Sequence, residues 1–165
     1  MNNLGYCYSV DQLIDRALEE DVGTGDITTL TTISEDAVGH GKYIAKECGV
    51  LCGIDLARRI YEKLDKGIVF TAYKKDGDEI KAGDIIAEVS GPAISLLTGE
   101  RVGLNLMQRL SGTATKTREC VKQIEGTRAS IADTKRRLPD FACLKSTQSE
   151  LAAAPTTASI SLTEF

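Results

Sequence analysis

The histidine and cysteine content limits the chemistry that this sequence can perform. His40 is the only histidine, so a Ser-His or Cys-His nucleophile relay is not expected. Cys48 and Cys52 could form half of a metal site, but no second Cys/His pair accompanies them. No metal-ligating residues are therefore predicted. The remaining reactive groups are cations and carboxylates, and these are expected to carry whatever chemistry the chain has.

Charge and hydropathy exclude further classes of protein. The 165 residues have a formal net charge of -4, which argues against a nucleic-acid-binding surface, although a few clustered Lys or Arg side chains can still bind a small anion. No apolar run approaches the roughly 20 residues that a membrane span needs. The first residues lack the pattern of a secretory signal. We expect a cytoplasmic protein whose five cysteines are reduced and partly buried.

Apolar periodicity predicts an α+β domain in which helices pack on a small β-sheet. Helices are expected over 9–21, 54–64, 93–110 and 111–124, with a break at Ser111-Gly112 and Gly126 closing the last one. Strands are expected over 42–51, 68–73, 85–90 and 128–133. The threonine-rich stretch after the turn at 23–26 is expected to be extended. Arg109, Lys116 and Arg118 are expected on solvated faces.

A repeated turn pattern, Asp76-Gly-Asp-x-Ile-x-x-Gly-Asp-x-Ile86, resembles the small hammerhead-like β module that also occurs in biotinyl and lipoyl carrier domains. A carrier displays a lysine at the tip of a tight hairpin. Lys74, Lys75 and Lys81 lie beside the turns, but in no recognisable carrier tetrapeptide. A non-catalytic binding module built on this sheet stays open as an alternative function.

Three segments carry a more specific resemblance. The run from Glu100 to Thr117, the segment from Ile131 to Thr134 and the run from Glu20 to Thr29 resemble quinolinate phosphoribosyltransferase, also called nicotinate-nucleotide pyrophosphorylase (carboxylating). The resemblance implies transfer of phosphoribose from phosphoribosyl pyrophosphate to quinolinate. The products are nicotinate mononucleotide, pyrophosphate and carbon dioxide, in NAD biosynthesis. It also implies Mg²⁺ and a homodimer with a shared active site.

The same resemblance assigns the substrate-binding residues. Arg101 matches the family arginine that reaches quinolinate from a neighbouring subunit, and Thr134, Lys135 and Arg136 match the end of the first barrel strand, where barrel active sites form. The family continues Thr-Arg-Lys-Thr after the aspartate, whereas Arg137 ends the corresponding run here. Arg101 could also be an ordinary helix arginine, and the later group a basic surface turn. A paralogous transferase with another substrate stays open as well.

The resemblance divides the chain into three parts. Residues 1–123 are expected to form the N-terminal substrate-binding domain, residues 124–141 the first strand and loop of a truncated α/β barrel, and residues 142–165 an aberrant or disordered tail. Read in another frame, the tail can encode a run close to the family's continuation, so we interpret it as a frameshifted translation. Catalytic residues are expected in the missing part of the barrel, and the chain as printed is expected to be inactive. Resequencing the coding DNA tests this interpretation.

Overall fold

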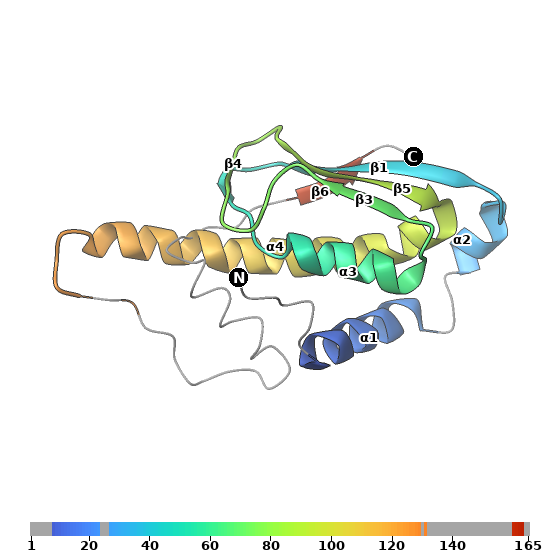
Figure 1. The fold of residues 1–165 in the computed structure, drawn as a ribbon, viewed down its shortest axis with the longest axis horizontal. Helices are drawn as coiled ribbons and strands as arrows, with labels where there is room; N and C mark the ends of the chain where they lie inside the picture. Colours follow the sequence, from blue (N-terminus) through green and yellow to red (C-terminus); the bar gives the residue numbers. More distant parts are fainter. Residues whose placement is uncertain (1–7, 24–26, 130, 132–159, 164–165) are drawn as a thin grey trace.

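The computed structural model describes residues 8–23, 27–129, 131 and 160–163 (Figure 1). The helices in these residues are α1 (Tyr8–Val22), α2 (Ile27–Thr32), α3 (Ile54–Leu64) and α4 (Ala93–Ile124). The strands are β1 (Val38–Ala45), β2 (Gly49–Val50), β3 (Val69–Ala72), β4 (Glu79–Ile80), β5 (Ile85–Pro92) and β6 (Ile160–Thr163). The expected mixture of helices and a small β-sheet is confirmed.

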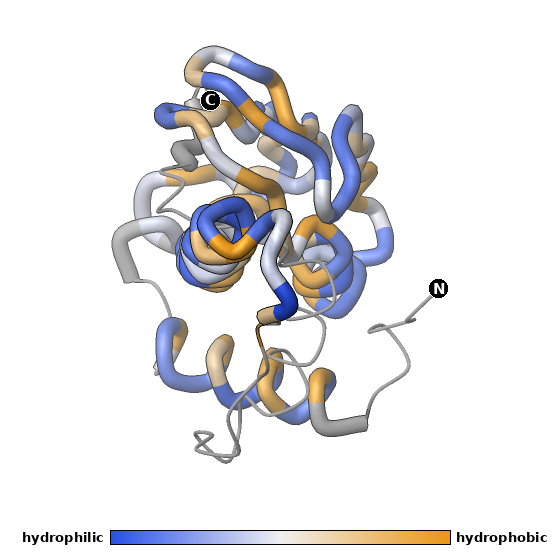
Figure 2. Tube along the Cα trace, turned by 90° about the vertical axis from the view of Figure 1, so that its left-hand side faces the viewer, coloured by the Kyte–Doolittle hydropathy of each residue, from blue (hydrophilic) through white to orange (hydrophobic). Residues whose placement is uncertain are grey.

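The molecule has three layers. A four-stranded antiparallel sheet of order β3-β5-β1-β6 lies on α3 and α4, and α1 lies on the other side of these helices (Figure 1). Figure 2 shows the same arrangement, with the sheet at the top and α1 at the bottom. β2 and β4 form a separate two-stranded antiparallel sheet. Alternate residues of β1 (Gly41, Tyr43 and Ala45) are buried, as expected for a strand with one face against helices.

Two apolar clusters hold the layers together. The first lies between the sheet and the pair α3 and α4, and its largest fully buried members are Tyr43, Leu51, Tyr61, Ile80, Ile86, Leu96 and Met107. The second lies between α1, α3 and α4, and its members include Val10, Leu13, Ile14, Leu56, Ile60, Leu106 and Leu110. The apolar stripes predicted for α1 and α3 are therefore confirmed as the faces that bury these helices.

Two glycines set the rotation of α4 about its axis. A Cβ atom at Gly99 would lie 2.8 Å from the Tyr61 ring, and one at Gly103 would lie 2.9 Å from the Tyr43 hydroxyl. These tyrosines are buried, and their hydroxyl oxygens lie 2.8 Å apart. Because successive helix residues are separated by about 100°, Arg101 lies on nearly the opposite side of α4 from both glycines. The close packing of Gly99 and Gly103 thus turns Arg101 away from the sheet.

The predicted break at Ser111-Gly112 is wrong, because α4 continues through it to Ile124. The Ser111 hydroxyl accepts a hydrogen bond from the Cys52 N–H (2.9 Å) and donates one to the Cys52 carbonyl (3.1 Å). One turn later, Thr115 Oγ1 accepts a hydrogen bond from the Val50 N–H (2.6 Å). Both hydroxyls are buried and satisfy backbone groups beside β2. The motif that favoured a break therefore joins α4 to β2.

The repeated turn pattern forms two similar turns. Residues 75–78 and 81–84 both read Lys-x-Gly-Asp, and the glycine of each turn has φ of +93°. In each turn the glycine N–H donates a 2.8 Å hydrogen bond to a backbone carbonyl, that of Leu51 in the first turn and that of Ala45 in the second. Both turns therefore form the same backbone hydrogen bond, and the residues that accept it, Ala45 and Leu51, are six positions apart. Lys74 next to the first turn is paired with Asp84 (3.1 Å).

Two further expectations are wrong at residues that the structure describes, and four residues of the tail take part in the sheet. The threonine-rich stretch forms the short helix α2, which packs against α4 through contacts that local propensity does not anticipate. Arg128, Ala129 and Ile131 are exposed and form no strand, since no described strand lies beside them to pair with. Ile160–Thr163 of the tail form β6, which supplies a partner to the edge of β1.

Candidate functional site

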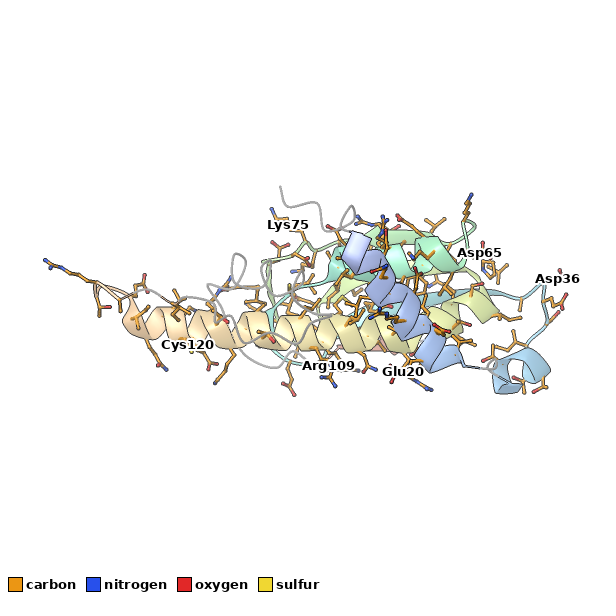
Figure 3. All side chains as sticks on the ribbon, turned by 90° about the horizontal axis from the view of Figure 1, so that it is seen from below. Glu20, Asp36, Asp65, Lys75, Arg109 and Cys120 are labelled. Atoms are coloured by element: carbon orange, nitrogen blue, oxygen red, sulfur yellow. The ribbon has the colours of Figure 1, made fainter. Side chains whose placement is uncertain are left out.

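A hollow of about 660 Å³ lies between α1, α2 and α4. Its apolar lining includes Val22, Leu97 and Leu104. Its polar lining consists of Asp21, Thr29, Thr98, Glu100, Arg101, Asn105 and Gln108. Figure 3, seen from below, shows α1 lying across the first half of α4. The hollow therefore combines an apolar floor with acidic, basic and amide groups, as small-molecule sites do.

Helix geometry explains why α4 contributes most of the lining. Residues 97, 101, 104 and 108 are three or four positions apart and so lie on one face of the helix. The buried residues Leu96, Gly103 and Met107 lie on the face that packs against the rest of the domain. The same packing that buries one face of α4 thus presents the other face to the hollow.

Arg101, which the sequence predicts to contact substrate, lies at the edge of this hollow. Its Nη1 atom is 3.2 Å from Oδ1 of Asp21 at the end of α1, and these are the partners of an ion pair that joins α1 to α4. The Arg101 side chain is 74% exposed, whereas Asp21 is 24% exposed. The guanidinium is therefore held on one side and open to solvent on the other.

Glu100 adds a second acid to the hollow. Burial raises the pKa of its carboxyl above the usual value, and the smaller attraction of neighbouring Arg101 acts in the opposite direction. Asp21 and Glu100 leave the hollow with more acidic than basic side chains. An anionic ligand would therefore need to meet the open side of the guanidinium.

The other predicted substrate residues, Thr134, Lys135 and Arg136, lie outside the described residues. Their contact with substrate stays a prediction. The site also contains groups that the sequence analysis did not assign, above all Asp21 and Gln108. The helical spacing from Arg101 could have indicated Gln108, which lies seven residues further along α4. Nothing local indicates Asp21, which is 80 residues from Arg101.

The remaining basic residues of α4 have different surroundings. Arg109 and Lys116 are exposed, as predicted; Figure 3 shows Arg109 pointing away from the helix. Arg118 contradicts the prediction, since its side chain is only 20% exposed. It pairs with Glu79 and donates a 3.3 Å hydrogen bond to the Gly77 carbonyl. Arg118 thus ties α4 to β4 and the first of the two turns.

Metal-binding chemistry has no support in the described part of the chain. No cluster of three or more His, Cys, Asp or Glu side chains in it could hold a metal ion. Cys48 and Cys120 are exposed free thiols, whereas Cys52 is buried, and burial raises the pKa of the Cys52 thiol. The Cys48/Cys52 pair is therefore split between the surface and the core.

No described helix is both long and apolar enough to cross a membrane.

Comparison with known proteins identifies this architecture. Residues 26–111 match the family described as quinolinate phosphoribosyl transferase, N-terminal domain. A probable nicotinate-nucleotide pyrophosphorylase (carboxylating) of Bacillus subtilis is 38% identical over 145 residues, which are 88% of this chain and 48% of that protein. The chloroplastic nicotinate-nucleotide pyrophosphorylase (carboxylating) of Arabidopsis thaliana is 38% identical over 133 residues, which are 80% of this chain and 38% of that protein.

Solved structures agree with the sequence comparison. NadC from Streptococcus pyogenes superposes with a TM-score of 0.84 at 30% identity, covering 90% of this chain and 53% of that one. The nicotinate-nucleotide pyrophosphorylase from Francisella tularensis gives a TM-score of 0.82 at 34% identity with the same coverage. The chain spans about half the length of these bacterial relatives. It belongs to the quinolinate phosphoribosyltransferase family and carries that family's N-terminal domain.

Proposed function

We propose that this chain is the substrate-binding part of an enzyme that transfers phosphoribose to quinolinate in NAD biosynthesis. Membership of the family supports the reaction class. The observation that carries the proposal is the position of Arg101, at the edge of a hollow and with one side of its guanidinium open. A guanidinium in this setting can bind a carboxylate through two parallel hydrogen bonds.

The proposed reaction makes and breaks two bonds in turn. The ring nitrogen of quinolinate bonds to ribose C1 as the bond from C1 to the pyrophosphate oxygen breaks. The carboxylate beside the nitrogen then leaves as carbon dioxide, and its electron pair passes into the positively charged ring and takes up a proton. Arg101 would hold a carboxylate of the substrate while the ring reacts. Thr134, Lys135 and Arg136 would supply further contacts across a homodimer interface.

Mg²⁺ would accompany phosphoribosyl pyrophosphate, whose phosphates it neutralises. The described residues do not fit such an ion, because Asp21 is paired with Arg101 and no acidic cluster is available. We therefore assign it no ligand and no step. A cytoplasmic location is part of the same proposal and is supported by the free thiols of Cys48, Cys52 and Cys120.

Binding of quinolinate to the full chain tests the proposal. The side-chain Nε–Hε signal of Arg101, assigned by its loss in Arg101→Lys, should move with added quinolinate and saturate. Nicotinate, which has one carboxylate fewer, should bind more weakly. A saturable shift with another aromatic or heterocyclic acid but none with quinolinate would favour a paralogous transferase. No shift with any of these acids would refute a substrate-binding role for Arg101.

A further inference from the structure

We infer that Asp21 is a positioning residue that orients Arg101 for the substrate. This inference rests on the proposed function, because it requires that Arg101 contacts an anionic ligand. Asp21 lies in the last turn of α1, and Arg101 lies in the third turn of α4. Neither the sequence pattern around Asp21 nor its acidic character suggests a role in binding an anion. Its contact with Arg101 does.

The geometry of the contact leaves part of the Arg101 guanidinium available to bind a ligand. Asp21 Oδ1 accepts a single hydrogen bond from Nη1 of Arg101, at 3.2 Å. Within the part of the chain that the structure describes, the guanidinium has no other partner. The Nη2 and Nε donors lie on an edge of the guanidinium that matches the two oxygens of a carboxylate. Asp21 can therefore hold one side of Arg101 while a ligand occupies the other.

Asp21 is itself fixed by contacts that do not involve Arg101. Asp11 on α1 forms a bidentate ion pair with Arg59 on α3, with distances of 2.6 and 2.8 Å, and Asp15 pairs with Lys63. The apolar stripe of α1 is buried against α3 and α4 as well. α1 thus stays in place without the Asp21–Arg101 pair. The Asp21–Arg101 pair can therefore restrict the Arg101 side chain, which is long and exposed and would otherwise sample many rotamers.

Asp21 has two opposing effects on an anionic ligand. Restricting Arg101 favours binding, whereas the negative charge of Asp21 disfavours it. Exposed ion pairs of this kind add little to stability, so the pair is expected to act on binding more than on folding. Glu100 lines the same hollow and carries the same charge, but forms no hydrogen bond with the Arg101 guanidinium among the described contacts. It therefore provides a matched control for charge.

The test is titration of quinolinate into the full chain, following the Arg101 Nε–Hε signal, with four variants. Asp21→Asn should weaken binding about three- to five-fold, an amount typical of losing an exposed charge pair. Asp21→Glu should restore most of the affinity, because it keeps the carboxylate. Glu100→Gln should tighten binding about two-fold, which shows that loss of charge alone does not weaken it. Asp15→Asn, which breaks another α1 ion pair away from the hollow, should bind as the wild type does.

The outcomes separate this inference from the proposed function. If wild-type chain gives no saturable shift, the proposed function fails and the role of Asp21 fails with it. If the wild type binds and Asp21→Asn binds equally well or more tightly, only the positioning role is overturned. If Asp15→Asn weakens binding as much as Asp21→Asn does, the effect belongs to the docking of α1 and the role assigned to Asp21 is wrong.

Discussion

The two halves of α4 use polar side chains in opposite ways. In the first half, Arg101 and Gln108 line a hollow and belong to the candidate site. In the second half, the Ser111 and Thr115 hydroxyls are buried and bind the backbone beside β2. The mostly exposed Arg101 adds little to the stability of the fold, whereas the two hydroxyls satisfy groups that would otherwise be buried without partners. Polar residues on one helix can thus contribute either to ligand binding or to the stability of the fold, and the groups that they contact distinguish the two roles.

Removing Arg101 is expected to have the largest effect on binding. Arg101→Ala should weaken quinolinate binding at least about ten-fold, because hydrogen bonds from a charged donor to a carboxylate are lost. The thermal midpoint should stay within about 2 °C of the wild type, since the side chain is mostly exposed. Ligand-detected NMR and thermal unfolding measure the two quantities. A large loss of stability with unchanged binding would place Arg101 with the structural half of α4.

Ser111→Ala should show the reverse behaviour. The buried N–H and carbonyl of Cys52 would both lose their hydroxyl partner, which should cost about 2–3 kcal/mol of unfolding free energy. Quinolinate binding by the folded fraction should be unchanged, because Ser111 does not line the hollow. Chemical denaturation gives the first value and titration the second. Ser111→Thr, which keeps the hydroxyl, is the matched control for the hydrogen bonds.

The two halves of α4 also show which features of the fold and site can be predicted from the sequence and which cannot. Apolar periodicity correctly predicted α1 and α3, because each stripe is a local property of its own helix. Local propensity wrongly predicted a break at Ser111, since the partners of that hydroxyl lie 59 residues away. The sequence pointed to Arg101 only through resemblance to a family. Asp21 lies in the Glu20–Thr29 run that carries the same resemblance, but its contact with Arg101 has no local signal because the two residues are 80 positions apart.

The segment that Ser111 holds is also supported from its other side, by Asp76. The Asp76 carboxylate accepts a hydrogen bond from the Ile54 N–H (2.9 Å) at the start of α3. Burial raises the pKa of Asp76 to about 6, against the smaller effects of its backbone hydrogen bonds. A folded-state pKa above the unfolded value means that this group stabilises the fold most when protonated. Its contribution is therefore complete below about pH 4 and is lost as the pH rises to about 6.

Asp76→Asn should abolish this pH dependence. The amide oxygen can still accept the Ile54 hydrogen bond, but it carries no charge to bury. The variant should be more stable than the wild type at pH 7.5 by about 3 kcal/mol, with the difference shrinking toward zero near pH 4. Denaturant titrations of both proteins across this pH range measure the difference. A stabilisation that is equal at pH 4 and pH 7.5 would show that folding does not raise the pKa of Asp76.

Glu100 should produce the smallest effect, and it tests the first half of α4 in the same way. Burial raises the pKa of its carboxyl, so it takes up a proton at a higher pH than an exposed glutamate does. As the pH falls, protonation removes a negative charge from the hollow, and quinolinate binding should tighten about two-fold before the ligand itself is protonated. Glu100→Gln should bind at the tighter level at every pH, and its titration curve should be flat where that of the wild type rises. Parallel curves for the two proteins would instead place the ligand beyond the reach of Glu100 and outside the hollow beside Arg101.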